Sequence, residues 1–96
     1  MTDARIDELI QKGFKRWTKG NMDRLYINAA DLGLVCDYYK TGNICSADFR
    51  GERISNSEGA RMKAAKTFID VKTEKVHSDN RTLLRAAAEL AGIELS

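Results

Sequence analysis

The short spacing between strand-like segments constrains the fold of this chain most strongly. Each segment is a brief run of strand-forming residues, and turn signals such as Thr41-Gly42-Asn43 separate neighbouring runs. Parallel strands need connections of about a dozen residues or more, and most of these connections are shorter. The sequence therefore predicts an α+β fold, a small antiparallel sheet with helices packed mainly on one face. The predicted strands are residues 22–27, 34–39, 44–49, 53–54, 67–71 and 76–77.

The first predicted helix covers residues 3–18. Its apolar residues recur at steps of three and four, which is typical of one helix face turned to the core. Thr2 is a suitable N-cap, Gly20 a suitable stop, and Gly13 weakens the middle by about 1 kcal/mol relative to alanine. The predicted inner face consists of Ile6, Leu9, Ile10, Phe14 and Trp17.

Further helices have clearer end signals. Ser55 and Glu58 form the pattern of a capping box, which predicts a helix over residues 56–65. A short helical turn is expected at residues 29–32. The last helix is expected to begin after a cap at Ser78, Asp79 or Asn80 and to end at Gly92.

Length and composition indicate one globular domain covering residues 1–96. Hydrophobic residues make up 43% of the 96 and charged residues 31%, which is too apolar for a disordered tail. No run approaches the ~20 consecutive apolar residues of a membrane span, and residues 1–10 lack the layout of a signal peptide. We therefore expect a cytoplasmic protein with no membrane partner. The sequence leaves the oligomeric state open.

Catalytic and metal-binding patterns are weak, so we expect a protein that is not an enzyme. His77 is the single histidine, and no serine or cysteine stands in a recognisable nucleophile setting. We expect no cofactor and no metal, because the glycines are scattered and the cysteines lack paired spacing. A two-residue loop at Thr41-Gly42 would place Tyr38 opposite Cys45 and Cys36 opposite Ala47. The two cysteines would then be diagonal, too far apart for a disulfide, and we expect free thiols.

Two basic blocks are the candidate partner-binding surfaces. Residues 12–24 carry five cations and one acid, and residues 50–66 carry five cations and two acids, although the whole chain is only +2. Such blocks suit an acidic or phosphate-bearing surface, on a protein or a nucleoprotein complex. A run of charge is also a common solvated face, and Phe14 and Trp17 also fit the core. The candidate residues are Lys12, Lys15, Arg16, Lys19, Arg24, Tyr38, Tyr39, Arg50, Arg53, Arg61 and Lys63, with Lys66 closing the second block.

Three stretches resemble small uncharacterised accessory proteins of phages and mobile elements. They are residues 15–28, 39–44 and 54–58. The resemblance implies a non-catalytic inhibitor of a host-defence nuclease complex, as anti-CRISPR proteins are. The mildly basic charge differs from the acidic DNA mimicry that many such inhibitors use.

Three functions are therefore open at the level of the sequence. The first is a non-catalytic binding protein, a phage-type accessory protein or inhibitor. The second is a stand-alone nucleic-acid-binding domain, and the third is a small enzyme that uses His77 with a carboxylate.

Overall fold

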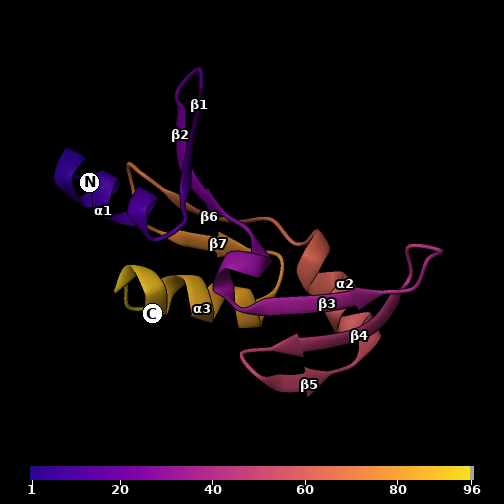
Figure 1. Ribbon diagram of the computed structural model, residues 1–96. Coiled ribbons are helices and arrows are strands. Elements are labelled where there is room, and N and C mark those ends of the chain that lie inside the picture. Colours follow the sequence, from indigo (N-terminus) through magenta and orange to yellow (C-terminus); the bar gives the residue numbers. More distant parts are fainter. Residues whose placement is uncertain (96) are drawn as a thin grey trace.

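The computed structural model describes residues 1–95, which form three α-helices, one 3-10 helix and seven strands. The strands make two antiparallel sheets, with the orders β1-β2-β6-β7 and β3-β4-β5 (Figure 1). This confirms the α+β class with antiparallel strands. The elements are α1 (Asp3–Gln11), β1 (Lys15–Lys19), β2 (Met22–Ile27), η1 (Ala29–Leu32), β3 (Leu34–Tyr38), β4 (Ile44–Phe49), β5 (Glu52–Ile54), α2 (Asn56–Ala64), β6 (Thr67–Asp70), β7 (Val76–Ser78) and α3 (Arg81–Ala91).

The four-stranded sheet has one covered face. Leu25 of β2 and Ile69 of β6 are opposite each other and completely buried. They belong to the same apolar core as Ile6 and Leu9 of α1 and Leu83 of α3. Because side chains alternate along a strand, the residues between these buried positions face the other way. The sheet therefore has a packed face and an open face.

The three-stranded sheet is covered by α2. Its helix approaches β4 so closely that a Cβ atom at Gly59 would lie 2.6 Å from the Cβ of Ala47. Glycine is therefore required at this helical position, despite its low helix propensity, because only a hydrogen fits against the strand. Cys36 of β3 is half-buried on this packed face.

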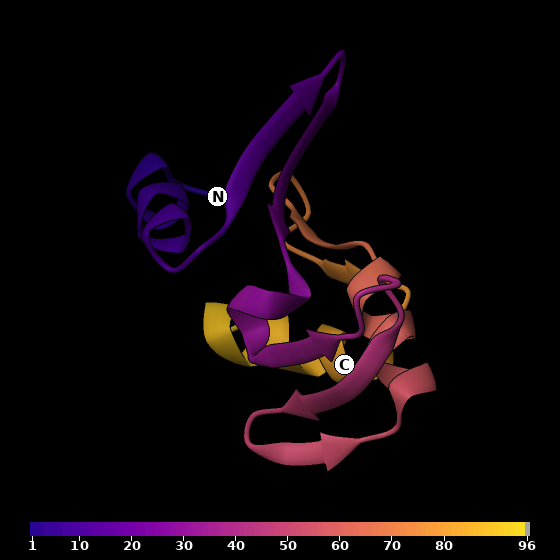
Figure 2. The same cartoon turned by 45° about the vertical axis from the view of Figure 1, so that its right-hand side comes forward.

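The first helix ends at Gln11, so the predicted helix over residues 3–18 is wrong in its second half. Gly13 has φ +116°, which stops the helix, and Lys15–Lys19 pair with β2 as a strand. Gly20 (φ +58°) and Asn21 make a two-residue hairpin loop, in which glycine supplies the positive φ. Phe14 lies in the core as predicted, whereas Trp17 is 39% exposed rather than buried. The resulting β1–β2 hairpin projects from the rest of the molecule (Figures 1 and 2).

The remaining helix ends follow the sequence signals closely. Ser55 accepts a hydrogen bond from the backbone N–H of Glu58 at 3.1 Å, as the capping box predicts. The carboxylate of Glu58 instead accepts from Asn80 and Arg61, so it connects α2 to the start of α3. Asn80 caps α3, and Gly92 ends it with φ +69°.

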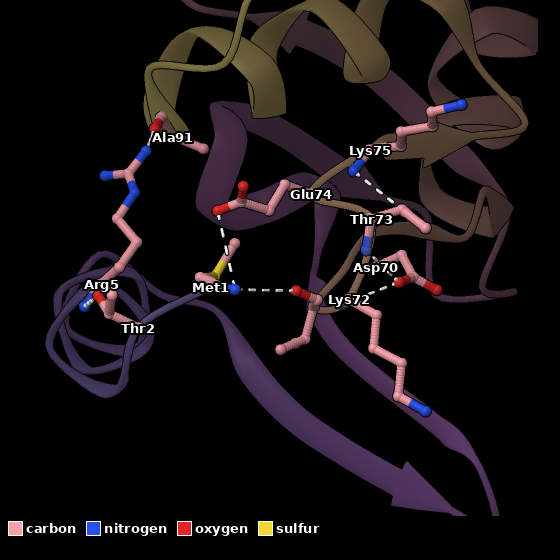
Figure 3. Close-up of polar contacts among 10 residues, drawn as sticks. Met1, Thr2, Arg5, Asp70, Lys72, Thr73, Glu74, Lys75 and Ala91 are labelled. Carbon is pink, nitrogen blue, oxygen red and sulfur yellow. Dashed lines mark hydrogen bonds and ion pairs between the residues drawn. The ribbon is translucent and has the colours of Figure 1, made fainter.

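Polar contacts fix α1 and the β6–β7 turn at their places in the fold (Figure 3). Thr2 caps α1 by accepting from the N–H of Arg5, and the Arg5 guanidinium donates to the carbonyl of Ala91 in α3. Asp70 accepts from the backbone N–H groups of Lys72 and Thr73 at 2.9 and 3.0 Å. These two bonds organise the turn that brings β7 back alongside β6. No helix within residues 1–95 is long and apolar enough to cross a membrane.

Candidate functional site

A row of aromatic rings crosses the open face of the four-stranded sheet. In the strand register Tyr26 is opposite Phe68, and Phe68 is opposite His77. The centroids of these neighbours are 5.1 and 5.0 Å apart, and the Phe68 and His77 rings are stacked. Trp17 of β1 meets the Tyr26 ring edge-on at 6.0 Å. Each of the four strands therefore contributes one ring to a continuous strip, which we call the aromatic row: Trp17, Tyr26, Phe68 and His77.

Strand alternation explains why these rings face outward. Tyr26 lies between the buried Leu25 and Ile27, and Phe68 lies between the buried Thr67 and Ile69. The buried positions point into the core, so the rings point away from it. Trp17 and His77, at the two ends of the row, are exposed.

Arg24 adds a guanidinium plane to the aromatic row. It lies opposite Trp17 in the register, with its Cζ atom 4.3 Å from the centroid of Phe68. Its Nη1 donates to the hydroxyl of Tyr26 at 3.1 Å. Its Nε is buried and has no hydrogen-bond partner among residues 1–95. The guanidinium group is thus fixed against the rings, with one face on Phe68.

Lysines surround the row, and within residues 1–95 no ion pair holds them. Lys15 is opposite Tyr26, and Lys19 lies two positions beyond Trp17 on the same face of β1. Lys66 lines a hollow of about 410 Å³ together with Trp17 and Tyr26. Asp70 is opposite Arg24 in the strand register, but its carboxylate accepts hydrogen bonds from backbone N–H groups of the β6–β7 turn. The N–H of Thr73, with that of Lys72, lowers the pKa of Asp70.

The structure divides the first predicted basic block. Lys15, Lys19 and Arg24 lie on the open face with the aromatic row. Lys12 donates from Nζ to the carbonyl of Leu90 at 3.1 Å, so it joins α1 to α3 instead. Arg16 faces the opposite side and makes a two-pronged contact with Asp23, at 3.0 and 2.7 Å, which lowers the pKa of that carboxyl. The predicted helix over residues 3–18 would have placed the cations of this block on its outer face, and that face does not exist, because residues 15–19 form a strand.

The second block is mostly neutralised by local carboxylates. Each of its three arginines makes a surface ion pair, at distances between 2.8 and 3.3 Å. Such exposed pairs contribute little stability, but they occupy the cations. The pairs are Arg50 with Glu89, Arg53 with Asp48, and Arg61 with Glu58.

Lys63 is different from these arginines. Its Nζ lies 4.4 Å from the centroid of the Tyr38 ring, in a cation–π contact, with no carboxylate partner among the described residues. Tyr38 and Tyr39 are both exposed, at 44% and 60%. The structure therefore brings Tyr38 and Lys63 together, whereas Tyr39 lies alone after the end of β3.

The cysteines and His77 form no evident reactive group. The β3–β4 register shifts between Asp37 and Tyr38, so Tyr38 faces Ile44 rather than Cys45 as the sequence predicted. Cys36 is opposite Ala47, as predicted. Both cysteines are free thiols, Cys36 half-buried and Cys45 exposed. Among residues 1–95, no hydrogen bond or ion pair joins His77 to a carboxylate.

Tyr26 and Phe68 were not predicted from the sequence as surface residues. The signal that could have found them is their position between apolar residues in strands that are buried on one face. The Gly20-Asn21 dipeptide, a typical hairpin loop, would also have placed Lys15 opposite Tyr26.

No family model matches this chain, and no curated protein or solved structure is significantly similar to it.

Proposed function

We propose that the protein binds single-stranded nucleic acid, without catalysis, on the open face of its four-stranded sheet. The observation that carries the proposal is the aromatic row, with one ring from each strand and unpaired cations around it. Rings on an open sheet are a recurrent means of stacking unpaired bases.

The chemistry of the face suits a single strand better than a duplex. The bases of a duplex are stacked on each other, so their flat faces cannot reach Trp17 or His77. A single strand can place its bases on the rings and on the guanidinium plane of Arg24. Lys15 and Lys19 then lie where they can contact phosphates.

Stabilisation of the sheet is the competing explanation for the rings. Cross-strand aromatic pairs contribute roughly 0.2–1 kcal/mol each, so part of the row has a structural value. That explanation does not account for Lys15, Lys19 and Lys66, which form no ion pair within residues 1–95. The test must therefore separate binding from stability.

Binding can be measured directly, because Trp17 is the single tryptophan and lies in the proposed site. Titration with oligo-dT or oligo-U of about ten nucleotides should quench its fluorescence, whereas a duplex of equal length should bind more weakly. In anisotropy measurements on a labelled oligonucleotide, Trp17→Ala should weaken binding about tenfold, since stacking contributes roughly 1–3 kcal/mol per base. Val35→Ala is the control, an exposed change on the open face of the other sheet.

Salt dependence gives a second measurement. Each phosphate contact on a single strand contributes a slope of about −0.7 to log K against log salt. Contacts from Lys15 and Lys19 together should give a slope of about −1.4. The absence of single-strand binding at low salt, or binding that Trp17→Ala and Val35→Ala weaken equally, would contradict the proposal.

The role as an inhibitor of a host-defence nuclease complex stays a prediction. The proposed face is compatible with it, because the nucleic-acid component of such a complex offers both bases and phosphates. Catalysis by His77 stays an untested alternative to the expectation that the protein is not an enzyme. Stacking of His77 on Phe68 fits a binding role, and His77→Ala should weaken oligonucleotide binding if that role is correct.

A further inference from the structure

We propose that the bound strand continues beyond the four-stranded sheet and places a further base against Tyr38, with a phosphate near Lys63. This inference rests on the proposed function and extends its site from one sheet to both. Its basis is a series of three neighbouring hollows that share residues or adjoin along the chain.

Tyr38 and Lys63 stand between two of these hollows. One has a volume of about 460 Å³ and includes Asn28 and Ala65, and the other has about 600 Å³ and includes Asn56. Tyr38 and Lys63 line both. Each volume is within the range of small-ligand sites, which is sufficient for a base. Tyr38 can therefore present its ring to a base that enters from the side of the four-stranded sheet.

The first of these hollows is connected to the aromatic row through neighbouring residues of the chain. Asn28 lies two residues beyond Tyr26 in the chain, just past the end of β2. Ala65 is the immediate neighbour of Lys66, which lines the hollow at Trp17 and Tyr26. Lys63 and Lys66 are three residues apart, so their Cα atoms are at most about 11 Å apart. The two lysines therefore mark a short path from the aromatic row to Tyr38.

The charge of the path favours a polyanion. No aspartate or glutamate lines any of the three hollows, and Lys63 and Lys66 do. Phosphates are therefore attracted along this path. The amide of Asn28, at the entrance, can form hydrogen bonds with a base edge.

Oligonucleotide length separates this inference from the proposed function. One base per ring of the aromatic row needs about four nucleotides, so dT4 tests that row alone and dT10 tests the longer path. The parent protein should bind dT10 more than tenfold tighter than dT4. The double variant Tyr38→Ala/Lys63→Gln should lose that gain and keep its affinity for dT4 within twofold.

The matched control is Tyr39→Ala/Lys40→Gln, which changes the same two residue types directly after Tyr38 in the chain. Neither residue lines any of the three hollows, and both are exposed. This control should bind both oligonucleotides like the parent. Lys63→Gln alone should also reduce the salt slope for dT10 by about 0.7, and leave the slope for dT4 unchanged.

Several outcomes overturn the inference. A four-nucleotide site can bind dT10 at several positions along its length, which alone gives dT10 a modest gain over dT4. If dT10 binds no tighter than this gain, there is no extended path, although the proposed function stands. Equal weakening of dT4 and dT10 by the Tyr38→Ala/Lys63→Gln variant, or equal effects of variant and control, also excludes a specific contact. If the parent binds neither oligonucleotide, both the proposed function and this inference are wrong.

Discussion

The two sheets differ in whether the polar groups on their open faces pair with each other. On the three-stranded sheet, Ser46 donates to Asp37 and Arg53 donates to Asp48, each at 3.0 Å, so the polar groups of that face bind each other. On the four-stranded sheet, rings cover the centre and Lys15 and Lys19 have no ion-pair partner within residues 1–95. A face whose charges are already paired needs no ligand. A face with rings and unpaired cations has contacts to offer, and this difference locates the proposed site.

The largest expected effect distinguishes the two faces of the four-stranded sheet. Leu25→Ala, on the packed face, should reduce the free energy of unfolding by about 2–5 kcal/mol, because it leaves a cavity in the core. Trp17→Ala, on the open face, should change it by less than about 1 kcal/mol while weakening oligonucleotide binding. Urea denaturation measures both variants. A large loss of stability in Trp17→Ala would assign the ring to the core instead.

Gly59→Ala should destabilise the packing of α2 on the three-stranded sheet by about 1–3 kcal/mol. At an exposed helix position the same change would stabilise the helix by up to about 1 kcal/mol. The sign reverses here because the new methyl meets the Cβ of Ala47. Adding Ala47→Gly should restore part of the loss in thermal unfolding. A Gly59→Ala protein more stable than the parent would show that α2 can move away from β4.

Ser55→Ala should cost about 1 kcal/mol of stability through loss of the α2 cap. The hydroxyl accepts from the N–H of Glu58, which would be left without this partner. Asn28→Ala is the matched control, because the side chain of Asn28 makes no capping hydrogen bond at η1. The control should change the denaturation midpoint by less than half as much. Equal effects of the two changes would mean that the Ser55 bond contributes no stability.

The smallest effect concerns acid stability at the contact of α2 with α3. The hydrogen bond from Asn80, together with that from Arg61, lowers the pKa of Glu58. A lowered carboxyl pKa stabilises the fold above the ordinary value near 4.3, and this contribution is lost as the pH falls through the folded pKa. Glu58→Gln should therefore lose stability less steeply than the parent below about pH 4. Parallel pH profiles of unfolding would contradict the assignment.

Local signals predicted the parts of the fold that depend on short stretches of chain. The α+β class, the hairpin of residues 34–49, the Ser55 cap and the Gly92 stop were visible because each depends on neighbouring residues. The sequence predicts too long a first helix because Trp17 follows Phe14 by three residues, which suits a helix, whereas the stop depends on the positive φ of Gly13. The aromatic row depends on pairing β2 with β6 across about forty residues, and no local pattern reveals that pairing.

The position of β1 at the edge of its sheet has a consequence for solubility. All five of its residues are exposed, and one side of its backbone has no neighbouring strand in the order β1-β2-β6-β7. Exposed edges of this kind can recruit a strand from a second copy of the same chain, and lysines on them prevent that association. Lys15 and Lys19 are the charges on this edge that oppose such pairing. Removing both charges would leave an open edge that carries Trp17, and concentrated solutions of such a protein would aggregate.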